Sequence, residues 1–241
     1  MAERFERALL KAYRAADFEL EVLSNEAVAE NLRKVRFHCA EFMSRQGLHP
    51  GVWLRLWIPG DKGRYQRGYT AIELNHADDT FAIEFYLHGG PGLAQAWAQQ
   101  ASAGDRLSAT LYTGKDAFSP GKAPQTLLIG DPTSLPAINE ICASIEGPVT
   151  VILEAANEAD RRLPTATEVK WVAQSPGGIA VIEALGDLRL DHWACFIAAE
   201  SHTVKQLRRI VLERGASKSL LKARGYWTRG KSMGGKVDQE P

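Results

Sequence analysis

The sequence is short of cysteine, and this shortage argues against several classes of redox and metal protein. The only three cysteines, Cys39, Cys142 and Cys195, lie far apart in apolar surroundings and form no CxxC pair. An odd number of isolated thiols is typical of reduced core cysteines and not of a disulfide framework, a structural zinc site or an iron–sulfur cluster. We therefore predict no metal site, and any redox chemistry has to come from a bound organic cofactor.

The sequence also lacks an excess of charge and any long apolar run. Lysine plus arginine equal aspartate plus glutamate at 29 each, so there is no overall basic field for non-specific binding of nucleic acid. No run approaches the roughly 20 apolar residues that cross a bilayer, and the charged segment 1–18 has no signal-peptide core. We expect a cytoplasmic protein that has neither a nucleic acid nor a membrane as partner.

Hydrophobic residues make up 45% of the 241 residues, which is enough for one large or two small domains. In the first half, apolar residues alternate with period two, which is typical of half-buried strands. One helix is predicted near 93–100. The predicted strands number about six and suggest a small antiparallel barrel; they cover 18–23, 35–39, 52–58, 67–75, 81–87 and 105–113.

The pattern changes near residues 119–124, after which short apolar strands alternate with helices. This alternation predicts a parallel α/β domain. The fold class is therefore an N-terminal six-stranded antiparallel β-barrel, residues 1–121, followed by a C-terminal α/β domain, residues 122–241, whose polar tail from 231 is expected to be disordered. The expected strands are 126–130, 149–155, 169–174 and 192–199, and the expected helices are 134–145, 178–185 and one from about 202.

The string RGYT at residues 67–70 combines residue types that suit a flavin. Arg67 is a permanent planar cation suited to a phosphate, and Tyr69 offers a flat face for the isoalloxazine ring. Gly68 leaves room for the backbone to approach, and Thr70 supplies a hydroxyl for the polar edge of the ring. The alternative interpretation is an ordinary edge strand with a solvated arginine.

The string HGGPGLAQAWA at residues 88–98 ends a strand with glycines and begins a helix near Leu93. Unpaired backbone N–H groups and the positive end of a helix dipole would then point to one place, which suits a pyrophosphate. The alternative to a cofactor-binding role is that His88 is an ordinary histidine at the end of a strand and that Trp97 is a tryptophan of the core. The cofactor-binding residues predicted in this string are His88, Gly89, Gly92, Leu93, Ala94, Gln95 and Trp97.

The second half contributes polar residues at the predicted carboxyl ends of its strands, where ligands bind in parallel sheets. The string GDPTSLPAI, residues 130–138, places Gly130, Asp131 and Thr133 after the first of these strands. Glu154 ends the next strand, where an acid is suited to a ribose hydroxyl. Arg161 and Arg162 follow, as ligands of a 2′-phosphate or as solvated arginines.

Two further strings complete the predicted site. The strand that contains HWACFIAAE ends at Glu200, and GYWTRG near the C-terminus holds Tyr226 and Trp227. This aromatic pair is suited to cover a flavin or a nicotinamide, and a tail packed on the core is the alternative.

A barrel followed by an α/β domain, with these strings in this order, resembles the siderophore-interacting protein family of the ferredoxin-reductase superfamily. The resemblance extends from about residue 14 to 231 and rests chiefly on 88–98, 130–138 and 225–230. The chain departs from the family pattern in three places. Leu93, Ala94 and Gln95 replace Pro-Ala-Ser/Thr, Pro132 replaces a glutamate, and Ala199 replaces a glycine.

The resemblance implies a flavin-dependent ferric-siderophore reductase. FAD would bind the barrel, NADPH or NADH the α/β domain, and the partner would be a ferric siderophore or another Fe(III) chelate. A flavin converts a two-electron donor into a one-electron donor, so no general acid, nucleophile or protein ligand to iron is required. The alternatives are a general flavin or ferric reductase, a reductase fed by ferredoxin, and a flavin- or siderophore-binding protein with poor turnover.

Overall fold

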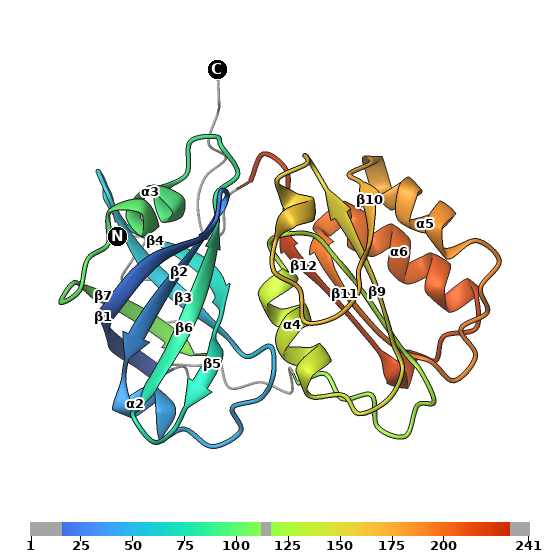
Figure 1. The fold of residues 1–241 in the computed structure, drawn as a ribbon, viewed down its shortest axis with the longest axis horizontal. Coiled ribbons are helices and arrows are strands. Elements are labelled where there is room, and N and C mark those ends of the chain that lie inside the picture. Colours follow the sequence, from blue (N-terminus) through green and yellow to red (C-terminus); the bar gives the residue numbers. More distant parts are fainter. Residues whose placement is uncertain (1–15, 112–116, 232–241) are drawn as a thin grey trace. The chain divides into compact units, whose positions relative to one another are not determined.

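The computed structural model describes residues 16–111 and 117–231, which divide into two compact units. The first unit extends to Ala117, and the second extends from Phe118 to Lys231 (Figure 1). The tail expected to be disordered lies outside the described residues from Ser232 onward. The assignment of a cofactor to each domain stays a prediction.

The first unit is built on one antiparallel sheet of seven strands in the order β4-β3-β7-β1-β2-β6-β5. Side chains alternate along these strands between buried apolar and more exposed positions, as the period-two pattern predicts. The strands are β1 (Ala16–Ala29), β2 (Leu32–His38), β3 (Trp53–Gly60), β4 (Gly63–Thr70), β5 (Ile72–Asn75), β6 (Thr80–Tyr86) and β7 (Arg106–Leu111).

The prediction of about six strands treats residues 67–75 as one strand, whereas the structure divides them at Ala71 between β4 and β5. These two strands form opposite edges of the sheet, although a single residue joins them. The sheet therefore has to curl until its edges approach each other. The curled inner face holds the core, in which Phe37, Phe81 and Phe85 are completely buried.

Two helices lie at opposite ends of the curled sheet (Figure 1). The short α2 (Ala40–Met43) is not foreseen by the sequence analysis, whereas α3 (Leu93–Gln100) has the predicted bounds. Helix α3 buries Ala94 and Ala98 against the core. Its C-terminus is fixed by Asn25, whose Nδ2 donates at 2.7 Å to the carbonyls of both Ala98 and Ala101. These two bonds satisfy carbonyls that a helix end leaves unpaired.

The second unit is a parallel sheet of five strands in the order β10-β9-β8-β11-β12, which confirms the α/β prediction. Its edge strand β12 contains the GYW string, for which the sequence analysis gives no strand. The strands are β8 (Thr126–Gly130), β9 (Val149–Ala155), β10 (Lys170–Ala173), β11 (Ala194–Glu200) and β12 (Leu221–Trp227).

Helices cover both faces of the parallel sheet, with α4 on one face and α5 and α6 on the other (Figure 1). Strands β8 and β11 are consequently apolar almost throughout, because neither face meets water. The helices are α4 (Leu135–Ala143), α5 (Ile179–Leu185) and α6 (Ser201–Glu213), with single 3-10 turns η1 (Asp160–Arg162), η2 (Pro176–Gly178) and η3 (Lys218–Leu220).

Within 16–111 and 117–231, no helix combines the length and the apolar character needed to span a bilayer. In the same residues, no three or more His, Cys, Asp or Glu side chains gather in a way that suits a metal ion.

Candidate functional site

The RGYT string forms the end of β4, and its side chains divide between the two faces of the sheet. Arg67 and Tyr69 pair with Leu56 and Leu54 of β3, both completely buried, and cross-strand partners share a face. Gly68 and Thr70 therefore face the other way. The structure brings Arg67 and Tyr69 together, but it does not bring the Thr70 hydroxyl to their face.

Tyr69 is half-buried, and its ring lies 4.4 Å from the ring of Phe85 on β6, measured between centroids. Trp97 of α3 contacts the same phenylalanine at 5.6 Å and stacks on Phe37 at 6.3 Å. Phe85 therefore connects the RGYT string to the glycine-rich string. Burial raises the pKa of Tyr69 against the opposing effect of the Arg67 charge, so the phenol stays protonated.

The segment 88–92 between β6 and α3 is held from within the chain by Gln95. Its Oε1 accepts from the backbone N–H of His88 at 3.0 Å, and its Nε2 donates to the carbonyl of Gly90. The ring of His88 lies over the glycines, with Nδ1 3.4 Å from the N of Gly90. Gln95 thus stabilises the loop, and a direct contact between its amide and a phosphate would require it to release this loop.

The start of α3 is suited to an anion. Its N-cap residue Gly92 has no side chain to accept from the first-turn N–H groups, so the positive end of the helix is left for another acceptor. Gly89 has a φ of 78°, and a Cβ there would meet nothing within 4 Å, so the loop is open on that side. Leu93 is exposed, whereas Ala94 is buried, which leaves only backbone groups of Ala94 to meet a ligand.

These residues fit a flavin. The half-buried ring of Tyr69 supplies a stacking surface, and Arg67 on the same face of β4 supplies a cation. The uncapped start of α3 supplies N–H donors for phosphate. Arg67 is half-buried, and its Nη1 donates at 2.8 Å to the carbonyl of Gln66. The first unit therefore contains groups that suit a flavin with phosphates.

In the second unit, the predicted residues gather at the carboxyl edge of the parallel sheet. The chain runs from β8 to β9 on one side and returns later to β11 on the other side of β8. The strand order therefore reverses between β8 and β11, which is the point where ligands bind in such sheets. Asp131 follows β8, Glu154 lies near the end of β9, Glu200 ends β11 and Trp227 ends β12.

Asp131 is only 2% exposed, and three donors from its own chain bind its carboxylate. Oδ1 accepts from the N and the Oγ1 of Thr133 at 2.9 and 2.5 Å, and Oδ2 accepts from Nε1 of Trp227 at 2.8 Å. Burial raises the pKa of Asp131, although these hydrogen bonds act in the opposite direction. Gly130 beside it leaves no room for a Cβ, because α4 packs there through Ser134 and Ile138.

Glu154 is 3% exposed and is bound to the loop after β10. Its Oε1 accepts from the N and the Oγ of Ser175 at 3.0 and 3.2 Å, and Ser175 Oγ also accepts from Ala180 N of α5. Burial raises the pKa of Glu154, and the charges of Asp131 and Glu200 add to the rise. Ser175 is not among the residues predicted from the sequence, where its signal is a serine between a strand and Pro-Gly-Gly.

Glu200 ends β11 and is the N-cap of α6. Its Oε2 accepts from the backbone N–H groups of His202 and Thr203 at 2.6 and 3.0 Å. All three acids of this edge are therefore bound to backbone N–H groups of the turn or helix that follows a strand. These are the donors that a phosphate would use.

The two arginines after β9 lie on η1. Nε of Arg161 pairs with Glu158 at 3.3 Å, and its Nη1 donates to the carbonyl of Trp171 on β10 at the same distance. Arg161 is therefore held against the edge strand. Arg162 is exposed, and its role as a phosphate ligand stays a prediction.

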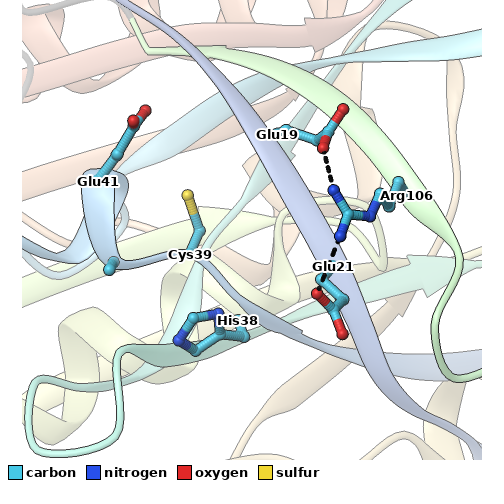
Figure 2. A pocket seen from close by; sticks show the side chains of 7 residues that line it. Glu19, Glu21, His38, Cys39, Glu41 and Arg106 are labelled. Atoms are coloured by element: carbon cyan, nitrogen blue, oxygen red, sulfur yellow. Dashed lines mark hydrogen bonds and ion pairs between the residues drawn. The ribbon is translucent and has the colours of Figure 1, made fainter.

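A shallow pocket of about 250 Å³ in the first unit is lined by none of the predicted residues (Figure 2). Arg106 lies between Glu19 and Glu21, at 2.5 and 3.7 Å from their carboxylates. Burial raises the pKa of the Cys39 thiol, which disfavours the reactive thiolate. We assign no function to this pocket, because its one arginine is already paired with Glu19 and Glu21.

An antiparallel sheet unit followed by a parallel α/β unit matches the ferredoxin-reductase-like fold. A solved siderophore utilization protein from T. fusca superposes with a TM-score of 0.77, at 22% identity, over 91% of this chain and 95% of that one.

The family is shown by two matches. Residues 46–111 match the siderophore-interacting FAD-binding domain, and residues 123–230 match the model described as siderophore-interacting protein. The chain belongs to the siderophore-interacting protein family.

Two curated relatives extend the comparison. The mycobactin import ATP-binding/permease protein IrtA of Mycolicibacterium smegmatis is 33% identical over 98% of this chain, which spans 29% of that protein's length. The NADPH-dependent ferric-chelate reductase of Escherichia coli is 25% identical over 67% of this chain and 65% of its own length.

Proposed function

We propose that the chain is a flavin-dependent ferric-siderophore reductase that moves electrons from NAD(P)H through FAD to Fe(III) chelates and releases Fe(II). The observation that carries the proposal is the meeting of Tyr69 and Trp97 on Phe85, which unites the two flavin strings in one unit. The match of this unit to a siderophore-interacting FAD-binding domain and the relation to a ferric-chelate reductase support it. A cytoplasmic location stays a prediction.

Each residue has a positioning role in this proposal. Arg67 would bind a phosphate through its guanidinium, the start of α3 would bind a second phosphate through N–H groups, and Tyr69 would bind the flat ring. Bound FAD accepts two electrons at once and gives them up singly. In one turnover, one NAD(P)H becomes NAD(P)⁺ and a proton, and two Fe(III) chelates each gain one electron. The chelate is a substrate, so the protein needs no iron ligand.

The test is a steady-state assay of the purified protein. A visible spectrum first establishes the flavin, and NADPH or NADH is then oxidised in the presence of a ferric chelate and a ferrous trap. We expect two trapped Fe(II) for each nucleotide oxidised, and more than one chelate should be compared. A flavin-loaded protein that traps no Fe(II) above the rate of free flavin would overturn the proposal.

A second candidate function is reduction of the flavin by a protein donor, such as a reduced ferredoxin. The acids at the carboxyl edge of the parallel sheet favour this candidate. Asp131, Glu154 and Glu200 place three carboxylates there, and each occupies N–H groups that a pyrophosphate would otherwise bind. Their charges also repel phosphate. Anaerobic reduction of the bound flavin by NADPH, by NADH and by chemically reduced ferredoxin, compared at equal concentration, distinguishes the two donors.

A further inference from the structure

The hydrogen bond between Trp227 and Asp131 crosses the reversal point of the parallel sheet. Trp227 ends β12, and β12 pairs with β11, which separates it from β8. Its Nε1 nevertheless donates to Oδ2 of Asp131, directly after β8, at 2.8 Å. The indole therefore spans the carboxyl end of β11 and lies over the place where a nucleotide binds in folds of this kind.

The backbone of Trp227 is fixed in this position. The register between β11 and β12 shifts between Ala199 and Glu200, so that Tyr226 is the additional residue of a bulge, a device that redirects the next side chain. Ser201 Oγ contacts the carbonyl of Trp227 and the hydroxyl of Thr228 at 2.8 Å each. The bulge and these bonds leave the side chain of Trp227 directed to Asp131.

Asp131 is shielded from a ligand by its burial and its own hydrogen bonds. It is 2% exposed, and its two oxygens already accept three hydrogen bonds from Thr133 and Trp227. Because the Nε1–H of Trp227 donates to Asp131, the indole offers a ligand only its ring face and its edge. The guanidinium of Arg229 lies 6.0 Å from the ring centroid, so a flat aromatic ligand on the indole face would have a cation beside it.

We propose that Asp131 is a positioning residue that holds the Trp227 indole as an aromatic wall, against which the nicotinamide ring of the pyridine nucleotide is oriented. The proposal rests on the proposed function, because it takes NAD(P)H as the donor. It assigns to Asp131 a role through Trp227 instead of direct contact with the cofactor.

A double-mutant cycle tests the coupling between the two residues. Trp227→Phe keeps a ring and loses the N–H, whereas Asp131→Asn keeps the shape and loses the charge. A hydrogen bond to a charged group supports a change of roughly tenfold. We expect each variant to raise the KM for NAD(P)H by about that factor with flavin content unchanged, and the double variant to be no worse than either single one.

Matched controls lie at the opposite edge of the same sheet. Trp193 is half-buried, and Asp191 pairs with Arg189 at 3.2 Å, both just before β11. Trp193→Phe and Asp191→Asn should leave the KM unchanged. If Trp227→Phe and Asp131→Asn lower the melting temperature but not the nucleotide affinity, or if their effects add independently, the proposal is overturned.

Binding is also measured without turnover, by quenching of tryptophan fluorescence with NADP⁺ and NAD⁺. We expect quenching in the wild type and its loss in Trp227→Phe. Absence of quenching in the wild type would overturn the inference. Normal quenching with no ferric reduction would instead overturn the proposed function and leave the inference standing.

Discussion

At the scale of the residue, Arg67 is the most direct test of the flavin site. Its guanidinium is half-buried on the face of β4 that also carries Tyr69. A charge-assisted bond to phosphate contributes about 1.5–3 kcal/mol, so Arg67→Ala should weaken FAD binding about ten- to a hundredfold. Fluorescence titration of the apoprotein measures this change.

Tyr69→Phe is the matched variant, because it keeps the ring that contacts Phe85 and loses only the hydroxyl. FAD affinity should hold. Equal FAD affinity in the wild type and in Arg67→Ala would mean that β4 is an ordinary edge strand with a solvated arginine. In that case Arg67→Ala should change the free energy of unfolding by no more than about 0.5 kcal/mol.

The raised pKa of Glu154 predicts a dependence of stability on pH. A carboxyl group whose pKa is raised on folding stabilises most below its ordinary pKa, and this contribution is lost as pH rises through the raised value. Glu154→Gln still accepts from Ser175 and does not titrate. The unfolding free energy of the Glu154→Gln variant, relative to that of the wild type, should therefore increase as pH rises above the ordinary glutamate pKa of about 4.3.

Denaturant melts at several pH values measure this difference. The exposed Glu146→Gln controls for loss of one negative charge. A difference between wild type and Glu154→Gln that stays constant or shrinks as pH rises would contradict the prediction.

The sequence predicts which residue types form the candidate site, but it does not predict which residues they contact. The sequence indicates that Asp131, Glu154 and Glu200 end strands at one edge, because parallel strands align their carboxyl ends. It does not show that Glu154 binds Ser175 or that Asp131 binds Trp227, because these partners are remote in sequence from the two acids. The division of RGYT between two faces also depends on the register with β3.

At the scale of the element, the packing of α4 on β8 depends on Gly130. A Cβ there would overlap Ser134 Oγ, Ile138 Cδ1 and the carbonyl of Ala198. Gly130→Ala should therefore displace α4 and destabilise the protein by about 1–3 kcal/mol. Gly147→Ala is the control, because a Cβ at that position meets nothing within 4 Å. Equal denaturation midpoints for the two variants would contradict the packing argument.

Element types followed from periodicity wherever one face is buried, as in β2 and β6. The prediction differed from the structure where local pattern is weak. A single residue, Ala71, separates β4 from β5, and only the curling of the sheet assigns them to opposite edges. In the edge strand β12, Lys222 and Arg224 alternate with Leu221 and Ala223, so the strand has no long apolar run. Pairing with β11 makes it a strand.

At the scale of the whole molecule, a bound cofactor should raise the free energy of unfolding by a measurable amount. FAD at about a hundred times its dissociation constant stabilises the native state by about 2.7 kcal/mol, which corresponds to a melting temperature higher by about 5 to 10 °C. FMN should give a smaller shift, because it lacks the second phosphate that the start of α3 is suited to bind.

Thermal shift with each flavin measures this difference, and mass spectrometry of the released cofactor identifies the flavin that copurifies. Equal shifts for FAD and FMN, or recovery of FMN alone after refolding with both, would contradict the assignment of α3 as a phosphate site.

The pairing of β7 has a consequence for how the protein is made. β7 is the last strand of its sheet in the chain, yet it lies between β1 and β3, with Thr110 opposite Asp17 and Arg55. Contacts so distant in sequence form slowly, because the loop must close before they stabilise anything. During synthesis, β1 and β3 must wait as unpaired edges until Leu111 has left the ribosome. The growing chain is therefore most exposed to aggregation just before β7 appears.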